Sequence, residues 1–187
     1  MIKKNLILAS GSPRRQNLLK EMGFDFKVIL KEVDEEYPKD MDVRKVAEFL
    51  ANKKSQAYQL KDDNDVLITA DSIVLYKNMI LNKPDSREQA IFYLSMIDDD
   101  QHEVMTGVCL KSKSKTLSFS DITTVYIEPT SKAEIIHYVD AYKPFDKAGA
   151  YGVQEWFGHN KIHKIEGSYT NIMGLPTAKL YEELLRF

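Results

Sequence analysis

One acidic residue, Asp71, stands inside a run that is otherwise typical of a buried strand. The run covers residues 66–76 and reads Val-Leu-Ile-Thr-Ala-Asp-Ser-Ile-Val-Leu-Tyr. An ionised carboxylate in such surroundings costs several kcal/mol unless a cation, a metal ion or hydrogen-bond donors compensate its charge. The pattern therefore indicates a functional acid. The alternative is an aspartate at a strand end whose side chain binds nearby backbone amides.

A second candidate site is the sequence Ala-Ser-Gly-Ser-Pro-Arg-Arg at residues 9–15. Ser12 is a favoured N-cap and Pro13 a favoured first helical residue, so a helix is predicted to begin directly after a strand. The N–H groups and the positive dipole end of such a helix attract anions, and arginine forks suit phosphate oxygens. The alternative is an ordinary surface helix start. The residues assigned to phosphate are Ser10, Ser12, Arg14 and Arg15.

A lysine lies on the apolar stripe of the long amphipathic helix predicted over Val43–Leu60. Lys54 follows Leu50 by four residues and Ala47 by seven, which places it on the stripe and not on the solvent face. A lysine there either extends its ammonium outward to water or faces an anion. Both interpretations stay open on the sequence alone. Lys83, just before Pro84, reads as an ordinary surface lysine when taken alone.

Carboxylates gather in the run Glu-Val-Asp-Glu-Glu at residues 32–36, after the second predicted strand. Asp34 and Glu35 could hold Mg²⁺ or Mn²⁺ beside a phosphate substrate, because hard cations take oxygen ligands; a charged loop is the alternative. Small residues gather at 146–154, which indicates close backbone approach or a tight turn. Gln154 ends that segment with an amide that can donate and accept, as reading a base edge requires.

The composition limits the classes of protein that fit. The chain has 187 residues, 43% of them hydrophobic, which suffices for a core in one domain, 1–187, that can have two lobes. Its net charge of −2 gives no global positive field for nucleic acid. A single cysteine, Cys109, excludes an internal disulfide, and the four histidines suggest no metal or nucleophile site. The apolar start is too short for a signal sequence or membrane span, so a cytoplasmic protein is expected.

Helical and strand patterns alternate along the chain, and at least one pair of strands is predicted to be antiparallel. This order favours an α/β fold with a mixed sheet flanked by helices. The predicted strands are Asn5–Ala9, Phe24–Leu30, 66–76, Ile80–Leu81, His102–Lys113 and Thr116–Glu128. The predicted helices are Pro13–Met22, Val43–Leu60, Ser86–Met96, Ser131–Val139 and Thr177–Leu185.

Taken in order, these segments resemble the Maf family of nucleotide pyrophosphatases, the septum-formation-protein family. The resemblance implies two lobes around a deep cleft, in a fold similar to inosine triphosphate pyrophosphatases. It also implies cleavage of nucleoside triphosphates between the α- and β-phosphates with a divalent cation, Mg²⁺ or Mn²⁺. The matching pieces are Ala9–Arg15, Val33–Glu35, Lys54, Ala70–Val74, Asn82–Pro84, Thr106–Val108, Asp146–Gly152 and Met173–Pro176.

The resemblance assigns a role to each candidate residue. Asp71 corresponds to the proton acceptor of the family and is also taken as a metal ligand, together with Asp34 and Glu35. The phosphate-binding bases correspond to Arg14, Arg15, Lys54 and Lys83.

Three positions separate the branches of the family. The branch similar to dTTP/UTP pyrophosphatases has Arg, Thr and Gln where this chain has Arg14, Ser72 and Gln154; the 7-methyl-GTP branch tends to have Trp, Gln and Glu. Ser72 keeps the hydroxyl of threonine, so Ser72 and Gln154 are expected to read a pyrimidine. The resemblance thus predicts hydrolysis of dTTP and UTP to the monophosphate and pyrophosphate, a housecleaning role in the nucleotide pool.

The family also suggests a homodimer. Stable nucleic acid or membrane partners are not expected, because the net charge is −2 and the apolar start is too short to span a membrane. One departure from the family pattern is Trp156-Phe157, where small residues are usual; these rings could pack on a dimer partner or cap the cleft. Two other functions stay open. One is a pyrophosphatase for 7-methyl-GTP or inosine-type nucleotides, and the other is a non-catalytic nucleotide- or DNA-binding regulator of cell division.

Overall fold

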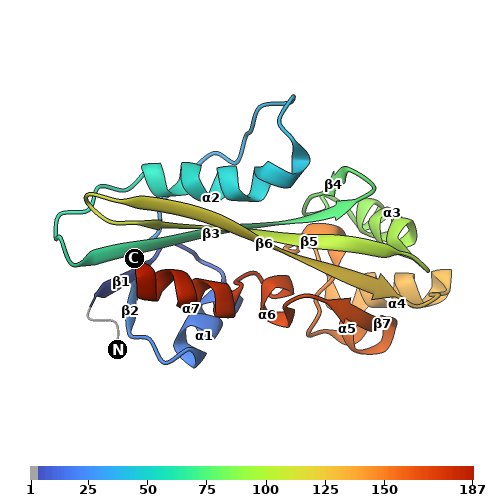
Figure 1. Cartoon of the computed structure of the whole chain (residues 1–187). Helices are drawn as coiled ribbons and strands as arrows, with labels where there is room; N and C mark the ends of the chain where they lie inside the picture. Colours follow the sequence, from blue (N-terminus) through green and yellow to red (C-terminus); the bar gives the residue numbers. More distant parts are fainter. Residues whose placement is uncertain (1–3) are drawn as a thin grey trace. The chain divides into compact units, whose positions relative to one another are not determined.

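The computed structural model describes residues 4–187 and confirms the predicted α/β fold with a mixed sheet flanked by helices (Figure 1). The seven-stranded sheet has the order β2-β1-β3-β5-β6-β7, and β4 pairs with β3. Strand β1 is parallel to β2 and β3, whereas β4 and β7 are antiparallel to their partners. The strands are β1 (Asn5–Leu8), β2 (Phe26–Val28), β3 (Asp65–Tyr76), β4 (Met79–Leu81), β5 (Gln101–Lys111), β6 (Thr116–Ile127) and β7 (Ile162–Glu166).

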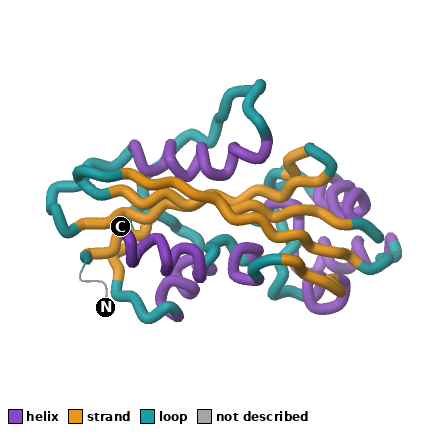
Figure 2. Tube along the Cα trace, viewed as in Figure 1, coloured by secondary structure: helices purple, strands orange, loops and turns teal. Residues whose placement is uncertain are grey.

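Helical segments connect the strands and flank the sheet (Figure 2). The α-helices are α1 (Pro13–Glu21), α2 (Val46–Gln56), α3 (Arg87–Ile97), α4 (Lys132–Tyr142), α5 (Trp156–Lys161), α6 (Tyr169–Ile172) and α7 (Thr177–Arg186). Two 3₁₀ turns complete the set, η1 (Val43–Lys45) and η2 (Ala148–Ala150). Within residues 4–187, the structure contains no helix of the length and apolar character that a membrane crossing needs.

The chain forms two compact units, and the long strands β3, β5 and β6 contribute residues to both. The first unit holds the described residues up to Ser72, then Thr106–Asp121 and Gly174–Phe187. The second holds Ile73–Met105 and Ile122–Met173. Each has buried apolar clusters of its own; one in the first unit joins Ile7, Tyr58 and Leu67, and one in the second includes Leu94, Tyr138 and Phe157.

In the first unit, helix α2 covers one face of the sheet, and α1 and α7 cover the other (Figure 1). Side chains of successive β3 residues therefore meet different helices, because neighbouring residues of a strand point to opposite faces. Thr69 donates its hydroxyl to the Ala51 carbonyl of α2 at 2.6 Å. Ser72, on the other face, accepts a hydrogen bond from Arg15 of α1 at 2.9 Å.

Several predicted boundaries were wrong. The second strand is only β2, Phe26–Val28, which pairs with β1 at three positions. The helix predicted over Val43–Leu60 is divided into η1 and α2 and ends at Gln56, because Tyr58 turns into the core of the unit. The helices α5 and α6 and strand β7 were not predicted. The helix predicted over Thr177–Leu185 is confirmed as α7.

A glycine on β5 lets helix α2 approach the sheet closely. A Cβ atom added at Gly107 would lie 2.3 Å from the backbone carbonyl carbon and oxygen of Ala47 and from the Glu48 nitrogen. Backbone atoms at that distance cannot yield as the end of a flexible side chain can, so α2 would have to move. Gly107 therefore sets the height of α2 above the strand.

We expect Gly107→Ala to lower the free energy of unfolding by about 3 kcal/mol or more, because the helix must shift from its packed position. The measurement is a urea unfolding curve. Gly11→Ala is the matched control, since its added Cβ would meet only the Leu30 methyl groups at 3.7 and 3.8 Å. Equal midpoints for the two variants would contradict the proposed close packing of α2.

Candidate functional site

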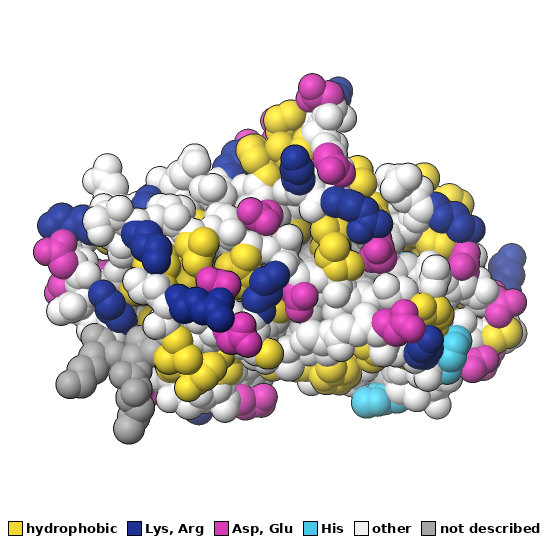
Figure 3. Space-filling model, in the orientation of Figure 1, with side chains coloured by type: hydrophobic (Ala, Val, Ile, Leu, Met, Phe, Trp, Pro, Cys, Tyr) yellow, Lys and Arg dark blue, Asp and Glu magenta, His cyan; other side chains and the backbone are white. Residues whose placement is uncertain are grey.

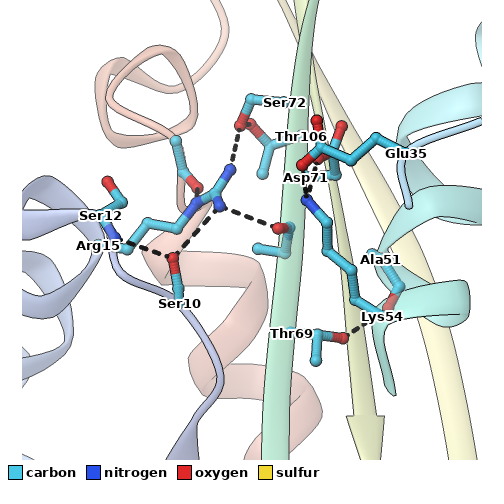
Figure 4. A network of polar contacts seen from close by, with 12 residues as sticks. Ser10, Ser12, Arg15, Glu35, Ala51, Lys54, Thr69, Asp71, Ser72 and Thr106 are labelled. Carbon is cyan, nitrogen blue, oxygen red and sulfur yellow. Dashed lines mark hydrogen bonds and ion pairs between the residues drawn. The ribbon is translucent and has the colours of Figure 1, made fainter. Parts of the chain in front are cut away.

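Asp71 is the seventh of twelve residues in β3 and is only 8% exposed. Its Oδ1 atom lies 2.5 Å from the Lys54 ammonium nitrogen (Figure 4). The alternative that Asp71 caps a strand end is therefore wrong, since the residue is in the strand interior and its partner is a cation. A salt bridge compensates the burial of its charge, as the sequence required.

Lys54 faces two carboxylates and does not extend into water. Its Nζ atom lies 2.7 Å from Glu35 Oε1 as well as 2.5 Å from Asp71, and the lysine side chain is 18% exposed. Helix α2 is held on β3 by the hydrogen bond from Thr69 to the Ala51 carbonyl, one turn before Lys54 (Figure 4). The stripe position of Lys54 thus brings its ammonium to the buried acid.

The structure separates the two acidic residues that the sequence assigned to a metal. Asp34 pairs with Lys53 at 2.8 Å and accepts the Glu36 N–H, contacts that lower the pKa of its carboxyl. Glu35 instead joins Asp71 at Lys54. The contacts of Asp34 therefore give no support to its predicted metal role.

The donor set still fits a cation that is bound mainly through its substrate. Among residues 4–187, no three side chains of the types His, Cys, Asp or Glu come together as a metal site. Two carboxylates, Glu35 and Asp71, do converge on one positive charge. Mg²⁺ commonly takes one or two protein carboxylates and completes its shell with phosphate oxygens and water. These two residues would hold such an ion.

The start of α1 differs from the expected cap. Ser12 does precede the helix, but its side chain makes no capping hydrogen bond. The Ser10 hydroxyl instead accepts the Ser12 N–H at 3.3 Å and Arg15 Nη1 at 3.4 Å. Pro13 occupies the first helical position as predicted, and the half-buried Arg14 follows it.

Arg15 is turned into the protein. It donates from Nε to the Gly174 carbonyl at 2.8 Å, from Nη1 to the Ala70 carbonyl at 2.9 Å, and from Nη2 to Ser72 Oγ at 2.9 Å (Figure 4). Burial lowers the pKa of the Arg15 guanidinium, and the charge of Asp71 acts in the opposite direction. This arrangement was not foreseen from the sequence, which assigned Arg15 to phosphate.

Lys83 and Gln154 belong to the second unit, and both are exposed. Lys83 follows strand β4, and the residue before it, Asn82, accepts the Gly149 N–H at 3.3 Å. The Gln154 carbonyl shares a hydrogen bond with His159 Nε2 at 3.1 Å. Within the second unit, the hydrogen bond from Gly149 to Asn82 therefore links the segment of small residues to the segment that carries Lys83.

Sequence reasoning missed Glu155, which holds the segment that carries Gln154. Tyr138 donates to Glu155 Oε2 at 2.5 Å, Lys147 pairs with Glu155 Oε1 at 2.9 Å, and the Gly152 N–H binds Tyr138 Oη at 3.0 Å. Phe157 was expected at a dimer surface or over a cleft. It is fully buried in the second unit, with its ring centroid 5.4 Å from that of Tyr138.

The comparisons with known proteins show the family of this chain. The profile of the family described as Maf-like protein matches residues 5–187. The chain belongs to the Maf family. A curated Maf relative from Flavobacterium johnsoniae, named dTTP/UTP pyrophosphatase, is 46% identical over 184 residues, which cover 97% of this chain and 94% of the relative. A relative of the same name from Parabacteroides distasonis is 43% identical over 187 residues, covering 99% and 97%.

The Maf chain also resembles a solved structure outside these relatives. The Staphylococcus aureus Ham1 protein matches with a TM-score of 0.53 and 20% identity, and the match covers 96% of this chain and all of that one. At this identity the likeness concerns the fold alone. It supports the mixed α/β architecture expected for a Maf protein.

We expect Lys54→Met to lower the free energy of unfolding by about 2–3 kcal/mol, because it leaves the buried Asp71 carboxylate without its cation. Lys53→Met is the matched control. It removes the adjacent lysine, whose partner Asp34 has a 60% exposed side chain, so a much smaller loss is expected. Urea unfolding of both variants gives the comparison, and equal losses would show that the Lys54 pair adds no special stability.

Proposed function

We propose that this Maf protein is a nucleoside triphosphate pyrophosphatase that hydrolyses dTTP and UTP to the monophosphate and pyrophosphate. The observation that carries the proposal is the buried Asp71 carboxylate paired with Lys54, in a chain whose curated relatives are named dTTP/UTP pyrophosphatases. The two units share one family match, so we treat residues 1–187 as one functional domain.

The proposed reaction begins with a water molecule that donates a hydrogen bond to Asp71. Asp71 accepts a proton as the water oxygen attacks the α-phosphorus. The bond from that phosphorus to the oxygen bridging the β-phosphorus breaks, and pyrophosphate leaves with the bonding electrons. The products are the nucleoside monophosphate and pyrophosphate, and the accepted proton later passes to solvent.

Positive charge from the protein would balance the triphosphate. The Lys54 ammonium already contacts Asp71, so a phosphate oxygen at Lys54 would lie near the proposed base. Arg14 at the start of α1 would add a second cationic contact. A divalent cation, Mg²⁺ or Mn²⁺, held by Glu35 and Asp71, would supply charge against the phosphate oxygens.

The remaining roles are predictions from sequence. Lys83 is proposed to bind phosphate and Gln154 to read the pyrimidine base. Ser72 was expected to read the base as well, but its hydroxyl is shared between Arg15 and Thr106, so we do not propose that role for it. A cytoplasmic housecleaning enzyme that forms a homodimer is the setting we propose for them. Basic and acidic side chains are interspersed on the face shown in Figure 3, which together with the net charge of −2 does not favour a DNA-binding regulator.

The experiment that tests the function is a panel of pyrophosphate-release assays on the full chain, with Mg²⁺, Mn²⁺ or a chelator. We expect kcat/KM for dTTP and UTP to exceed that for 7-methyl-GTP and ITP at least tenfold, and the chelator to abolish turnover. A different ranking would make the protein a pyrophosphatase of other specificity. Binding without any release would make it a nucleotide-binding regulator.

Replacing the proposed base should separate chemistry from binding. We expect Asp71→Asn to lower kcat by about 10²–10⁴-fold, the usual contribution of a general base. The affinity for a dTTP analogue with an imido group between the α- and β-phosphorus should change less than threefold. Asp65→Asn, at the start of the same strand, is the control and should keep the wild-type rate. A wild-type rate in Asp71→Asn would disprove the role of Asp71.

A further inference from the structure

Arg15 binds the strand on both sides of the proposed base. Its Nη1 donates to the carbonyl of Ala70 at 2.9 Å, and its Nη2 donates to the hydroxyl of Ser72 at 2.9 Å. These are the residues immediately before and after Asp71. The donors of a planar guanidinium have a fixed relative geometry. Two hydrogen bonds from it, to the residues on either side of Asp71, therefore fix the orientation of the strand at Asp71.

The third nitrogen of Arg15 joins another part of the first unit to this strand. Nε donates to the Gly174 carbonyl at 2.8 Å, in the loop that precedes α7. Gly174 has a φ of 109°, a conformation that L side chains rarely adopt. Arg15 thus connects the start of α1, the middle of β3 and the entry to α7.

The Ser72 hydroxyl extends the connection to the next strand. It accepts from Arg15 and shares a hydrogen bond of 2.8 Å with the Thr106 hydroxyl on β5 (Figure 4). The Ser72 Oγ atom therefore has two hydrogen-bond partners within the protein, Arg15 and Thr106. Asp71, whose side chain points to the opposite face toward Lys54, depends on the strand that this network holds.

We propose that Arg15 is a positioning residue for Asp71 and not a phosphate-binding residue. All three nitrogens of its guanidinium donate to protein oxygens, and each of those acceptors lies on β3, on the loop before α7 or at Ser10. The Ser72 hydroxyl belongs to the same network. Arg15 fixes the β3 backbone from one face, so that the carboxylate on the other face stays aimed at Lys54 and at the proposed water. This inference rests on the proposed pyrophosphatase function.

The test is the variant Arg15→Lys in the full chain, because a lysine keeps the charge but cannot reach three separate acceptors. We expect kcat for dTTP to fall at least tenfold, while the dissociation constant of the imido analogue changes less than threefold. Arg14→Lys is the neighbouring comparison and should instead weaken analogue binding. Arg186→Lys, on the exposed end of α7, is the control and should leave both quantities unchanged.

Amide hydrogen exchange supplies a readout that does not depend on turnover. We expect peptides covering residues 66–76 to exchange faster in Arg15→Lys than in the wild type, with no such change in Arg186→Lys. Unchanged exchange together with unchanged kcat would overturn the proposal. Analogue binding weakened tenfold at unchanged kcat would also overturn it, because a phosphate-binding residue gives that pattern.

A second variant covers the case in which Arg15→Lys does not fold. Ser72→Ala removes one acceptor and the link to Thr106, and a loss of kcat at constant analogue affinity is again expected. Loss of analogue binding at unchanged kcat would contradict the network. If the wild-type protein released no pyrophosphate at all, the proposed function would fall, whereas faster exchange of residues 66–76 in Arg15→Lys would still support the positioning role.

Discussion

The salt bridge between Lys54 and Asp71 is the interaction on which the first unit depends. A carboxylate in the middle of a buried strand is stable only beside a compensating charge, and the ammonium is supplied by the helix that packs on that face. The helix must therefore lie close to the sheet, as the contact of Gly107 with the Ala47 backbone allows. The close packing of α2 over Gly107 and the pairing of Lys54 with Asp71 thus both require α2 to lie at the same place on the sheet.

The face of β3 opposite this pair is built from neutral acceptors around one arginine. Arg15 is satisfied by two carbonyls and two hydroxyls, with Asp71 as a more distant attraction. The surroundings of the two cations that contact the middle of β3, Lys54 and Arg15, therefore differ. Lys54 meets two carboxylates, Glu35 and Asp71, whereas Arg15 meets two backbone carbonyls and two serine hydroxyls. This difference is the basis for proposing phosphate binding for Lys54 and a positioning role for Arg15.

The sequence could reveal Asp71 and Lys54 because each violates a local pattern. Asp71 interrupts an apolar run, and Lys54 interrupts a stripe with helical period, so both anomalies are visible within a dozen residues. The bond from Arg15 to Gly174 joins residues 159 positions apart, and no local pattern records it. For the same reason, the sequence could not separate Asp34 from Glu35. Their different partners, Lys53 and Lys54, follow from the path of the loop.

Short elements were missed for a related reason. Helix α5 has six residues and α6 has four, which is too short for a periodic pattern to emerge from their composition. Their formation depends on tertiary packing, as the burial of Phe157 against Tyr138 and Tyr151 shows. Long elements were identified because their patterns persist over many residues: a nearly continuous apolar run in β3, alternation in β6 and a helical period in α7.

The two adjacent lysines of α2, Lys53 and Lys54, also form ion pairs with two neighbouring residues of the acidic loop that precedes the helix. Lys53 pairs with Asp34, whose side chain is largely exposed to solvent, and Lys54 pairs with Glu35 beside the buried Asp71. A polyanion bound at Lys54, as proposed, would compete with Glu35 for the Lys54 ammonium and would leave the pair of Lys53 with Asp34 in place. Ligand binding would then increase the mobility of the loop, while the Lys53–Asp34 pair would still hold it to α2. Higher ionic strength would weaken the exposed Lys53–Asp34 pair before the more buried contacts of Lys54, because salt screens exposed charges more strongly.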